Sequence, residues 1–404
     1  MKKFDVPVTY RSGIISRVKE IRKLRDPRKQ DFSPTTLEFD NLTLVLPRHF
    51  GFCYGVENAI ERSFKAIKEN PDKRIFLLSE MIHNPAINED LLASGLRFIF
   101  DTSGQQLIEW NEITKEDIVI IPAFGTTLEI SAKLNEIGAI TEAYNTTCPF
   151  VEKVWKRSAE IGRDGFSVVI HGKYKHEETR ATFSHSNSNS PSVIVRDMRE
   201  AELLAEYIRG HRSAADFATD FAGKYSNGFD VTKDLKKLGV VNQTTMLATE
   251  TEEITQFLRA VMKELHGEDW STYFADTRDT LCYATNDNQQ STMAAAELGA
   301  SMALVVGGYN SSNTSQIADI LAQSMPTYFI RDADEIIDEN SIRHFDYPAQ
   351  QLRTTHGWLE AAGRRKVIVT SGASCPDSIL DAVIQRLLVV SSCRTDWDHV
   401  LAAL

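Results

Sequence analysis

The sequence predicts an α/β protein in which mainly parallel sheets are covered by helices on both faces. Short apolar runs such as "DIVIIPAFG" (117–125) and "SMALVVGG" (301–308) alternate with amphipathic, helix-like segments. Strands of a parallel sheet are buried on both faces, so they show continuous apolar runs and are connected through helices. The chain has 404 residues, 42% of them hydrophobic. At roughly 100 to 200 residues per domain, this length gives two or three domains, each with a sizeable core.

The strand-like runs can be placed in order along the chain, and each is followed by a helical pattern. They are "LTLVLP" (42–47), "RIFLLSE" (74–80), "DIVIIPAFG" (117–125), "FSVVIHGK" (166–173), "SVIVRD" (192–197), "LGVVNQTT" (238–245), "SMALVVGG" (301–308), "PTYFIRD" (326–332) and "KVIVTSG" (366–372). In such sheets, ligands bind beyond the carboxyl ends of the strands, where helix N-termini present N–H groups and a positive dipole end. We therefore expect functional residues at the strand-to-helix junctions.

The composition excludes several classes of protein. The sequence contains no run of about 18 apolar residues, the length needed to span a bilayer. The N-terminus, "MKKFDVPVTYRSG", lacks the apolar stretch of a signal peptide and begins no obvious transit peptide. We expect a bacterial protein of the reducing cytoplasm that binds no membrane. Five cysteines are too few, and odd in number, for a disulfide framework.

Charge is distributed unevenly. Residues 1–30 hold ten Lys or Arg against three Asp or Glu, a local charge of +7, and because the whole chain carries −11, the remainder carries −18. An acidic body argues against nucleic-acid binding. The basic segment 11–29, "RSGIISRVKEIRKLRDPRK", suits docking to an acidic partner, whereas the alternatives are a solvated helical extension or packing against a lobe or a second subunit.

Three cysteines lie just ahead of helix-like runs: Cys53 in "GFCYGVENAI", Cys148 in "TTCPFVEKVW" and Cys282 in "DTLCYATNDNQ". A helix N-terminus lowers a thiol's pKa, and thiolates are the ligands of soft metal centres. The intervals of 95 and 134 residues suggest one cysteine per lobe, with three lobes facing one another. A structural zinc site would show a local C-x-x-C pair, which is absent. Three unrelated buried cysteines remain the alternative.

Other junctions carry small polar or titratable side chains. Asn-Ser-Ser-Asn at 310–313 and Ser-Gly-Ala-Ser at 371–374 each follow a strand, where hydroxyl and amide groups beside free helix N–H groups make a phosphate cradle. Ser and Asn are also ordinary helix N-caps. The segment "HGKYKHEETRAT" (171–182) adds His171, His176, Glu177 and Glu178, a group suited to acid-base chemistry, with a charged surface turn as the competing interpretation.

Together these stretches resemble the 4-hydroxy-3-methylbut-2-enyl diphosphate reductase (LytB) family, whose members catalyse the last step of the non-mevalonate isoprenoid pathway. The resemblance runs from about residue 45 to about residue 390. It is carried by eight ordered motifs: "GFCYGVENAI", "IHNPAINEDLLASG", "TTCPFVEKVW", "KHEETRAT", "VNQTTM", "DTLCYATNDNQ", "VVGGYNSSNTSQIADI" and "VTSGASCPD". The N-terminal extension and "PAFGTTLE" (122–129) look like the longer branch of the family, known from chloroplasts and photosynthetic bacteria.

The resemblance implies that Cys53, Cys148 and Cys282 hold a 4Fe-4S cluster at the centre of three α/β lobes in a pseudo-threefold arrangement. Three thiolates leave one iron open, where the substrate's hydroxyl oxygen would bind during reductive loss of water. The products would be isopentenyl and dimethylallyl diphosphate. An enzyme of quinolinate synthase type, with another three-cysteine, open-iron cluster, is the runner-up, and a non-catalytic ligand-binding protein is the second rival.

Motif match also implies roles for individual residues. Glu178 would be the proton source, with His176 and Thr244 near the hydroxyl and Thr244 relaying the proton or orienting that hydroxyl. A Glu beside a His in a pocket that holds an anion would have its pKa raised, which keeps it protonated near neutral pH. The residues that would bind the diphosphate are His83, Ser311, Ser312, Asn313 and Ser374.

The sequence departs from the family at Phe124, where many relatives have a diphosphate-binding histidine that Lys173 or Lys175 would have to replace. Cys375 shares the helix-start context of the three ligands, but we expect a small packed thiol there rather than a fourth ligand. Cys393 has no motif around it.

Electrons for the reduction need an external donor, because the chain has no second cluster motif and no G-x-G-x-x-G fingerprint for a dinucleotide. We expect a ferredoxin or flavodoxin, which are usually acidic, guided to the enzyme by residues 11–29. The remaining partner is the small allylic diphosphate substrate, and the protein would be a monomer or a homodimer.

The motifs suggest a division of the chain. The expected parts are a basic extension (1–44), a first lobe with Cys53 (45–148), a second lobe with Cys148 at its start and the His-Glu-Glu motif (149–280), a third lobe with Cys282 and Asn-Ser-Ser-Asn (281–360), and a C-terminal segment with the Gly-Ala-Ser motif that closes the active site (361–404).

Overall fold

The computed structural model describes residues 4–275, 280–359 and 365–404, which form two compact units. The first unit comprises Met1–Glu61, His83–Ile87 and Tyr283–Leu404, and the second comprises Arg62–Ile82 and Asn88–Cys282. Helices α2 (Tyr54–Glu69) and α3 (Pro85–Ala93) therefore each begin in the first unit and end in the second.

The first unit is built on a five-stranded sheet in the order β1-β2-β13-β9-β10. An antiparallel hairpin joins the edge strand β1 to β2, and all other neighbours are parallel. Strands far apart in sequence meet in this sheet, since Val367 pairs with both Leu44 and Met302. The strands are β1 (Thr35–Glu38), β2 (Leu42–Leu46), β9 (Met302–Val306), β10 (Thr327–Ile330) and β13 (Arg365–Ser371).

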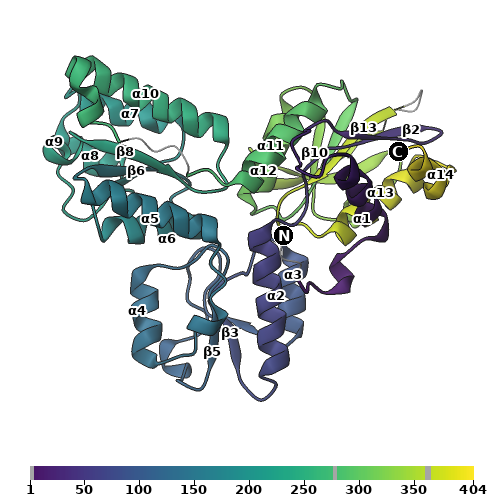
Figure 1. Cartoon of the computed structure of the whole chain (residues 1–404), viewed down its shortest axis with the longest axis horizontal. Coiled ribbons are helices and arrows are strands. Elements are labelled where there is room, and N and C mark those ends of the chain that lie inside the picture. The colour runs from purple at the N-terminus through teal and green to yellow at the C-terminus, as the bar shows by residue number, and fades with distance from the viewer. Residues whose placement is uncertain (1–3, 276–279, 360–364) are drawn as a thin grey trace. The chain divides into compact units, whose positions relative to one another are not determined.

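Alternating side chains of this sheet enter two separate cores. Leu44, Leu304 and Val369 pack toward α13, together with residues of α1, whereas Val45 and Val305 pack toward α11 and α12. Figure 1 shows α11 and α12 on one face of the sheet and α13 on the other. The helices of this unit are α1 (Gly13–Arg25), α11 (Tyr283–Ala296), α12 (Ser312–Ala322), α13 (Asp377–Val390) and α14 (Trp397–Ala402).

The segment after β10 corrects one sequence-based expectation. A helical pattern was predicted there, but a 3-10 turn at Ala333–Glu335 leads instead into an antiparallel hairpin of β11 (Ser341–Asp346) and β12 (Gln351–His356). The hairpin places Phe345 against Tyr309, with ring centroids 4.6 Å apart. Within the hairpin, Ile342 lies opposite Thr355 and Phe345 lies opposite Leu352, and cross-strand pairs of β-branched and aromatic side chains such as these stabilise an extended segment.

The second unit contains two three-stranded parallel sheets. In the first, β3 (Ile75–Leu77) lies between β4 (Arg97–Phe98) and β5 (Ile118–Ile120), and Phe76 and Val119 pack with Leu134 of α4 (Leu128–Ile137). Thr127 caps the N-terminus of α4 through its hydroxyl, and Gly138 ends the helix in the left-handed conformation that favours glycine.

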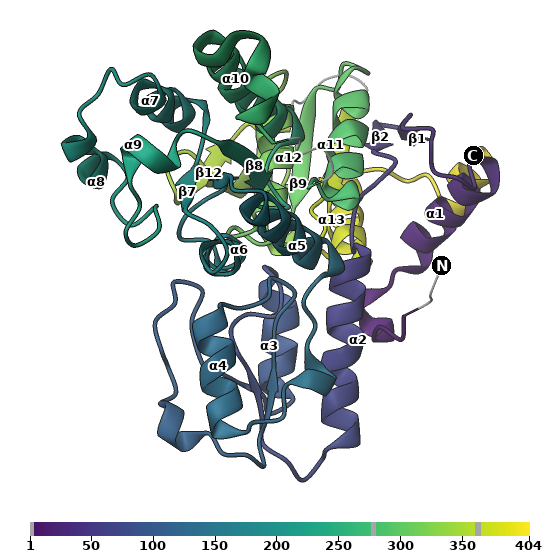
Figure 2. The same ribbon diagram turned by 60° about the vertical axis from the view of Figure 1, so that its left-hand side comes forward.

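In the second sheet of this unit, β6 (Ser167–His171) lies between β7 (Ser192–Val195) and β8 (Leu238–Asn242). Helices α7 (Met198–Ile208) and α10 (Ala248–His266) cover one face, and α5 (Pro149–Arg163) and α6 (Glu177–Asn187) cover the other, as Figure 2 also shows. Two one-turn helices, α8 (Phe217–Asp220) and α9 (Val231–Asp234), complete this part.

The predicted fold class, α/β with mainly parallel sheets, is confirmed. All nine strand-like runs form strands, and the sequence-based list misses β1, β4, β11 and β12. The expected lobe boundaries stay predictions; the one at 360/361 lies outside the described residues, and the one at 45 falls inside β2. How three lobes are arranged around a common centre also stays a prediction.

Candidate active site

Polar side chains of the first unit gather where β9 and β13 end side by side. The loop after β9 leads through Gly307 and Gly308 to Ser311, which caps α12 by accepting a hydrogen bond from the Thr314 N–H. The loop after β13 carries Ser374. Because β9 and β13 are parallel neighbours, their carboxyl ends bring both polar loops to one edge of the sheet.

Direct hydrogen bonds tie these loops together. The Ala373 N–H donates to Asn313 Oδ1 at 2.8 Å, and the Ser374 hydroxyl donates to the His83 carbonyl at 3.1 Å. His83 reaches this site from the segment His83–Ile87, which belongs to the same unit. The five residues expected to bind diphosphate therefore lie together, and all are at least nine-tenths buried: His83, Ser311, Ser312, Asn313 and Ser374.

Two glycines allow the loops to approach this closely. A Cβ on Gly308 would lie 2.5 Å from the His83 carbonyl oxygen, and a Cβ on Gly372 would lie 2.0 Å from Thr314 Oγ1. Any side chain at these positions would force the loops apart. Thr314 was not among the predicted site residues. The only feature of the sequence that pointed to it is its position in the same motif as Ser311 and Asn313.

One donor in this group is unsatisfied. Asn313 is 3% exposed, and its Nδ2 atom has no hydrogen-bond partner among the described residues, although its Oδ1 accepts from Ala373. A buried amide donor without a partner is costly. It lies at the N-terminus of α12, where N–H groups and the helix dipole favour an anion. The group is therefore equipped to bind a phosphate-like ligand.

A second group of predicted residues lies in the second unit, at the ends of the neighbouring strands β6 and β8. Glu178 is 1% exposed, and its carboxylate accepts hydrogen bonds from the Thr244 N–H and, at 3.0 Å, from the Thr244 hydroxyl. His176 is the N-cap of α6, and its Nδ1 accepts from the Glu178 N–H at 3.2 Å. The three residues expected to serve the hydroxyl group are thus in direct contact.

Gln243 holds this arrangement and was not predicted as a functional residue, although it stands in "VNQTTM". It is fully buried, and its Oε1 accepts from the Lys173 N–H at 3.1 Å and from the Thr179 hydroxyl at 2.9 Å. It therefore links the loop after β6 to α6, directly beside Thr244. His171 is also fully buried and hydrogen-bonds Thr251 at 2.8 Å, so it lies in the core of this unit.

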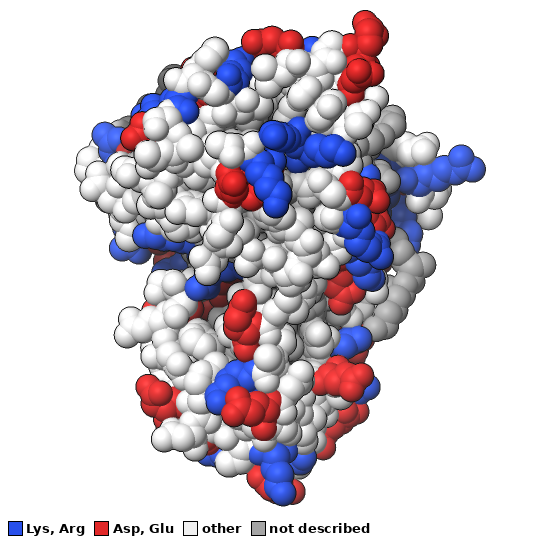
Figure 3. Space-filling model, turned by 90° about the vertical axis from the view of Figure 1, so that its left-hand side faces the viewer, with Lys and Arg blue, Asp and Glu red and all other residues white. Residues whose placement is uncertain are grey.

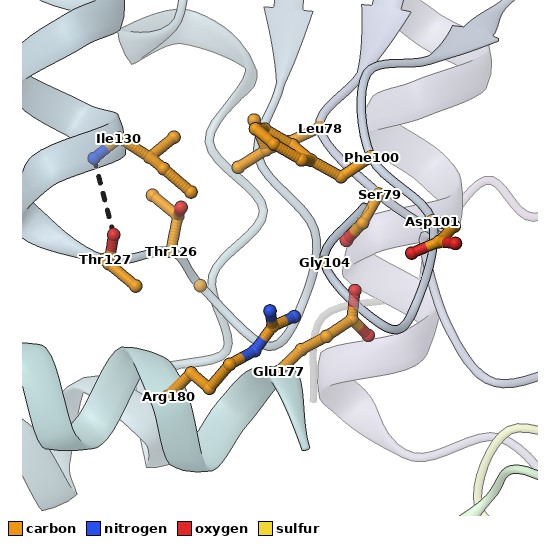
Figure 4. Close-up of a pocket in the computed structure, with 11 residues that line it drawn as sticks. Leu78, Ser79, Phe100, Asp101, Gly104, Thr126, Thr127, Ile130, Glu177 and Arg180 are labelled. Carbon is orange, nitrogen blue, oxygen red and sulfur yellow. Dashed lines mark hydrogen bonds between the residues drawn. The ribbon is translucent and has the colours of Figure 1, made fainter. Parts of the chain in front are cut away.

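Glu177 faces a different place from Glu178. It lines a pocket of about 80 Å³ together with Ser79, Asp101, Thr126 and Arg180. Figure 4 shows Glu177 and Arg180 extending into this pocket from α6. From the sequence, we expect only one of the two adjacent carboxylates to face the active-site pocket, and motif match selects Glu178. The two side chains do face different surroundings, but the role of Glu178 stays a prediction.

Phe124, which stands where many relatives have a histidine, packs edge-on against the His176 ring with centroids 5.6 Å apart. The aromatic ring thus contacts the N-cap of α6 instead of offering a charged donor. Lys175, one of the two suggested replacements, has its ammonium 5.7 Å from the centroid of the Tyr174 ring. Whether Lys173 or Lys175 replaces the histidine stays a prediction.

The three cysteines expected to hold a metal cluster all lie directly before helices. Cys53 precedes α2, and its N–H donates to the Ala373 carbonyl at 3.3 Å, which ties it to the loop of Ser374. Cys148 is the N-cap of α5, and Cys282 precedes α11. Within the described residues, no three His, Cys, Asp or Glu side chains are placed to hold a metal ion, so the shared cluster stays a prediction.

The two other cysteines differ from these three. Cys375 is fully buried, its Sγ lies 3.6 Å from the Pro376 carbonyl, and burial together with nearby Asp377 raises the pKa of its thiol far above the ordinary value. A thiol that resists ionisation is a poor metal ligand, which agrees with a packing role. Cys393 is half-buried near the C-terminus, where burial also raises the pKa of its thiol.

Comparisons with known proteins agree on one family. The LytB protein family matches residues 44–388. A 4-hydroxy-3-methylbut-2-enyl diphosphate reductase of Trichormus variabilis is 36% identical over 358 residues, covering 88% of this chain and 87% of its own. One of the same name from Prochlorococcus marinus is 34% identical over 392 residues, covering 96% and 95%.

Solved structures share the fold at low sequence identity. An E-1-hydroxy-2-methyl-but-2-enyl-4-diphosphate reductase from Plasmodium falciparum matches with a TM-score of 0.62 at 19% identity, covering 85% of this chain and 87% of its own. A second, (E)-4-hydroxy-3-methyl-but-2-enyl diphosphate reductase, matches with a TM-score of 0.51 at 22% identity, covering 86% and 99%. Among the described residues, no helix has the length and apolar character needed to cross a membrane.

Proposed function

This chain belongs to the LytB protein family, and we infer that it is a 4-hydroxy-3-methylbut-2-enyl diphosphate reductase. It is an oxidoreductase that converts (E)-4-hydroxy-3-methylbut-2-enyl diphosphate to isopentenyl and dimethylallyl diphosphate in the last step of the non-mevalonate pathway. The resemblance drawn from the sequence is confirmed by the family match and by the names of the curated relatives.

The observation that carries this function is the buried Asn313 amide in the first unit. Its unpaired Nδ2 donor, the α12 N-terminus and the surrounding hydroxyl groups suit the diphosphate of the substrate. Neutral donors and backbone N–H groups bind such an anion without a lysine. We assign diphosphate binding to His83, Ser311, Ser312, Asn313 and Ser374.

The reaction breaks the allylic C–O bond and consumes two electrons and two protons, releasing water and leaving a new C–H bond. One proton must reach the departing oxygen. Glu178, buried and in hydrogen-bond contact with Thr244, is suited to deliver it, because a carboxyl in its acid form can donate directly while Thr244 fixes its position. His176 caps the same helix turn and would help to orient the substrate hydroxyl.

The chemistry of the donor set fits an iron-sulfur cluster. Cys53, Cys148 and Cys282 are soft sulfur donors, and each stands at the start of a long helix, where the dipole stabilises a thiolate. We propose that these three residues hold a 4Fe-4S cluster with one open iron. When bound, such a cluster would supply the electrons and a Lewis-acidic iron for the reduction.

A small acidic protein, ferredoxin or flavodoxin, is proposed as the electron donor. The basic N-terminal residues are not equally available to it, since Arg17, Lys19 and Arg22 form ion pairs with acidic residues of the same unit. Other basic residues near the end of α1 are exposed, and they surround Leu24, which is itself 82% exposed. These residues are Lys23, Arg25, Arg28 and Lys29. We propose these four residues and Leu24 as part of the landing surface.

Elsewhere, charges of both signs are mixed. On the face that Figure 3 shows, Lys and Arg side chains are interspersed with Asp and Glu. A body with net charge −18 outside the first 30 residues would repel an acidic donor, so a local basic surface has to guide the encounter. The oligomeric state and the cytoplasmic location stay predictions.

A binding experiment separates this function from the runner-up. Quinolinate synthase acts on carboxylates, so an enzyme of that type should bind a dicarboxylate and ignore inorganic diphosphate. We expect the chain to bind inorganic diphosphate, with Asn313→Ala weakening the affinity by about 10-fold through loss of a charge-assisted hydrogen bond. Asn310→Ala, at an exposed position of the same loop, is the matched control. Calorimetric binding of a dicarboxylate but not of diphosphate would refute the assignment.

A further inference from the structure

The N-terminal extension crosses the turn that bears Cys53. The Phe4 ring packs edge-on against Tyr54, with centroids 5.0 Å apart, and the Tyr10 ring packs edge-on against Phe52, with centroids 6.3 Å apart. Tyr54 and Phe52 are the two residues that flank Cys53 in the chain. The extension therefore touches this cysteine's neighbours on both sides.

Lys19 extends the contact to the start of the turn. Its ammonium lies 4.6 Å from the centroid of the Phe50 ring and forms an ion pair with Asp377, at 2.7 Å to Oδ1 and 3.0 Å to Oδ2. A Cβ on Gly51 would lie 2.7 Å from Asp377 Oδ1 and 3.2 Å from the Lys19 Nζ, so the pair is packed directly on the turn. Asp377 begins α13 three residues after Ser374.

Hydrogen bonds and buried side chains hold the extension in place. The Asp5 N–H donates to Glu61 Oε1 at 2.8 Å, and the Arg11 guanidinium donates to the Phe4 carbonyl at 3.2 Å. Five of its apolar side chains are almost wholly buried, which is unlike a solvated arm: Phe4, Val6, Tyr10, Ile15 and Val18. An ordered segment with a buried apolar face can restrain its neighbours.

The turn itself needs such restraint. Gly51 has φ of +76°, a conformation that glycine reaches without strain, but glycine also loses the most backbone freedom on becoming ordered. A ligand on an unrestrained turn would sample many positions, and metal sites depend on supporting contacts to orient their ligands.

We propose that residues 4–19 form a clamp that fixes the turn at residues 50–54 and so positions Cys53 as a cluster ligand. This inference rests on the assignment of Cys53 to the cluster in the proposed function. It gives the extension a role distinct from donor docking, because the clamp uses Phe4, Tyr10 and Lys19, whereas the landing surface uses exposed residues beyond Arg22. Lys19 is a positioning residue in this account.

The test measures how fast the reconstituted full-length protein loses its visible iron-sulfur absorbance to an iron chelator under anaerobic conditions. Lys19→Met keeps the apolar stem over Phe50 and removes the charge that pairs with Asp377, so loss should be about 10-fold faster. Lys19→Arg should restore slow loss. Arg17→Met is the matched control, because it removes an ion pair of the same helix, with Asp398 at 2.7 Å, that does not involve the turn.

The aromatic contacts give an independent variant. Tyr10→Leu keeps an apolar side chain in place but removes the ring edge from Phe52, and it should also speed cluster loss, whereas Val8→Ala, at an 80% exposed position of the same segment, should not. Thermal unfolding of the apoprotein serves as the stability readout, and we expect the Lys19 and Arg17 variants to be alike in it.

Equal rates of cluster loss in Lys19→Met and Arg17→Met would overturn the clamp. So would a change in apoprotein stability with no change in chelation rate, because that result describes a merely structural contact. A wild-type protein that holds no iron after reconstitution would instead refute the cluster assignment, which keeps the two failures distinguishable.

Discussion

Glu178→Gln is the substitution that tests the proposed proton path most sharply. Gln has nearly the same volume as Glu and can still accept one hydrogen bond from Thr244, but it has no acidic proton. General acids contribute roughly 100-fold to 10,000-fold to turnover, so we expect at least about a 100-fold loss, equivalent to about 2.7 kcal/mol in the activation barrier. Substrate binding should largely survive, because the residues proposed to bind the diphosphate belong to the other unit.

The structure also predicts a stability cost for this variant. Both Glu178 oxygens accept from Thr244, one from the N–H and one from the hydroxyl, and Glu178 is 1% exposed. An amide must turn its NH₂ group toward one of these donors, although the hydroxyl can rotate to accept. We expect a loss of about 1 kcal/mol, at the low end of the cost of a disturbed buried hydrogen bond, and this would appear in urea unfolding of the apoprotein.

Glu177→Gln is the matched control, since Glu177 is adjacent in sequence and buried, but lines the separate pocket shown in Figure 4. Single-turnover reduction with a small chemical reductant isolates the chemical step from donor docking. We expect little change in Glu177→Gln. Equal losses in the two variants would mean that the proton path does not run through Glu178 alone, and the assignment of roles within this helix turn would have to be withdrawn.

Three further predictions follow from the cysteines, the basic surface and a half-buried histidine, His49. The proposed ligand cysteines are Cys53, Cys148 and Cys282. Serine at any of them should reduce iron content and visible absorbance, because alkoxide is a hard ligand, whereas Cys375→Ser should retain both. The exposed basic residues of the proposed landing surface are Lys23, Arg25, Arg28 and Lys29. Neutralising them should slow ferredoxin-driven turnover in a salt-dependent way, since exposed charges are screened over about 8 to 10 Å. Turnover with a chemical reductant should be unchanged. Burial beside Arg48 and Lys29 lowers the pKa of His49 from 6.5 to about 4. As the pH falls from 6.5 toward 4, the unfolded chain therefore takes up the proton before the folded protein does. The free energy of unfolding should fall by about 2 kcal/mol over this range, after allowance for solvent screening. His49→Gln should remove that loss in apoprotein melting curves, and an unchanged pH profile would contradict it.

The sequence was informative about the fold wherever strands are buried on both faces. β6 and β9 are buried along their whole length, so their apolar runs are unbroken and easily recognised. β12 has an almost wholly exposed pattern, and β4 has only two residues, so neither shows an apolar run. The segment after β10 was wrongly predicted as helical, because local charge patterns cannot reveal a hairpin fixed by cross-strand pairs.

The sequence predicts the chemical character of the candidate site better than it predicts the contacts that hold the site residues in place. Ser311 and Asn313 could be found because they follow a strand within a short motif. The contacts that hold these residues could not be predicted, because they join residues distant in sequence. For example, the Ser374 hydroxyl donates a hydrogen bond to the carbonyl of His83, 291 positions away. The same limit applies to Lys19 and Asp377, which are 358 positions apart. Packing against a lobe was one of the alternatives for the basic segment, but the sequence could not identify this ion pair.

The central claim is tested most directly by anaerobic turnover of the reconstituted full-length protein. With (E)-4-hydroxy-3-methylbut-2-enyl diphosphate and a reduced chemical mediator, we predict that mass spectrometry will show isopentenyl and dimethylallyl diphosphate, formed with two electrons consumed per product molecule. Unchanged substrate in a protein that carries about four irons per chain, as a 4Fe-4S cluster requires, would contradict the account.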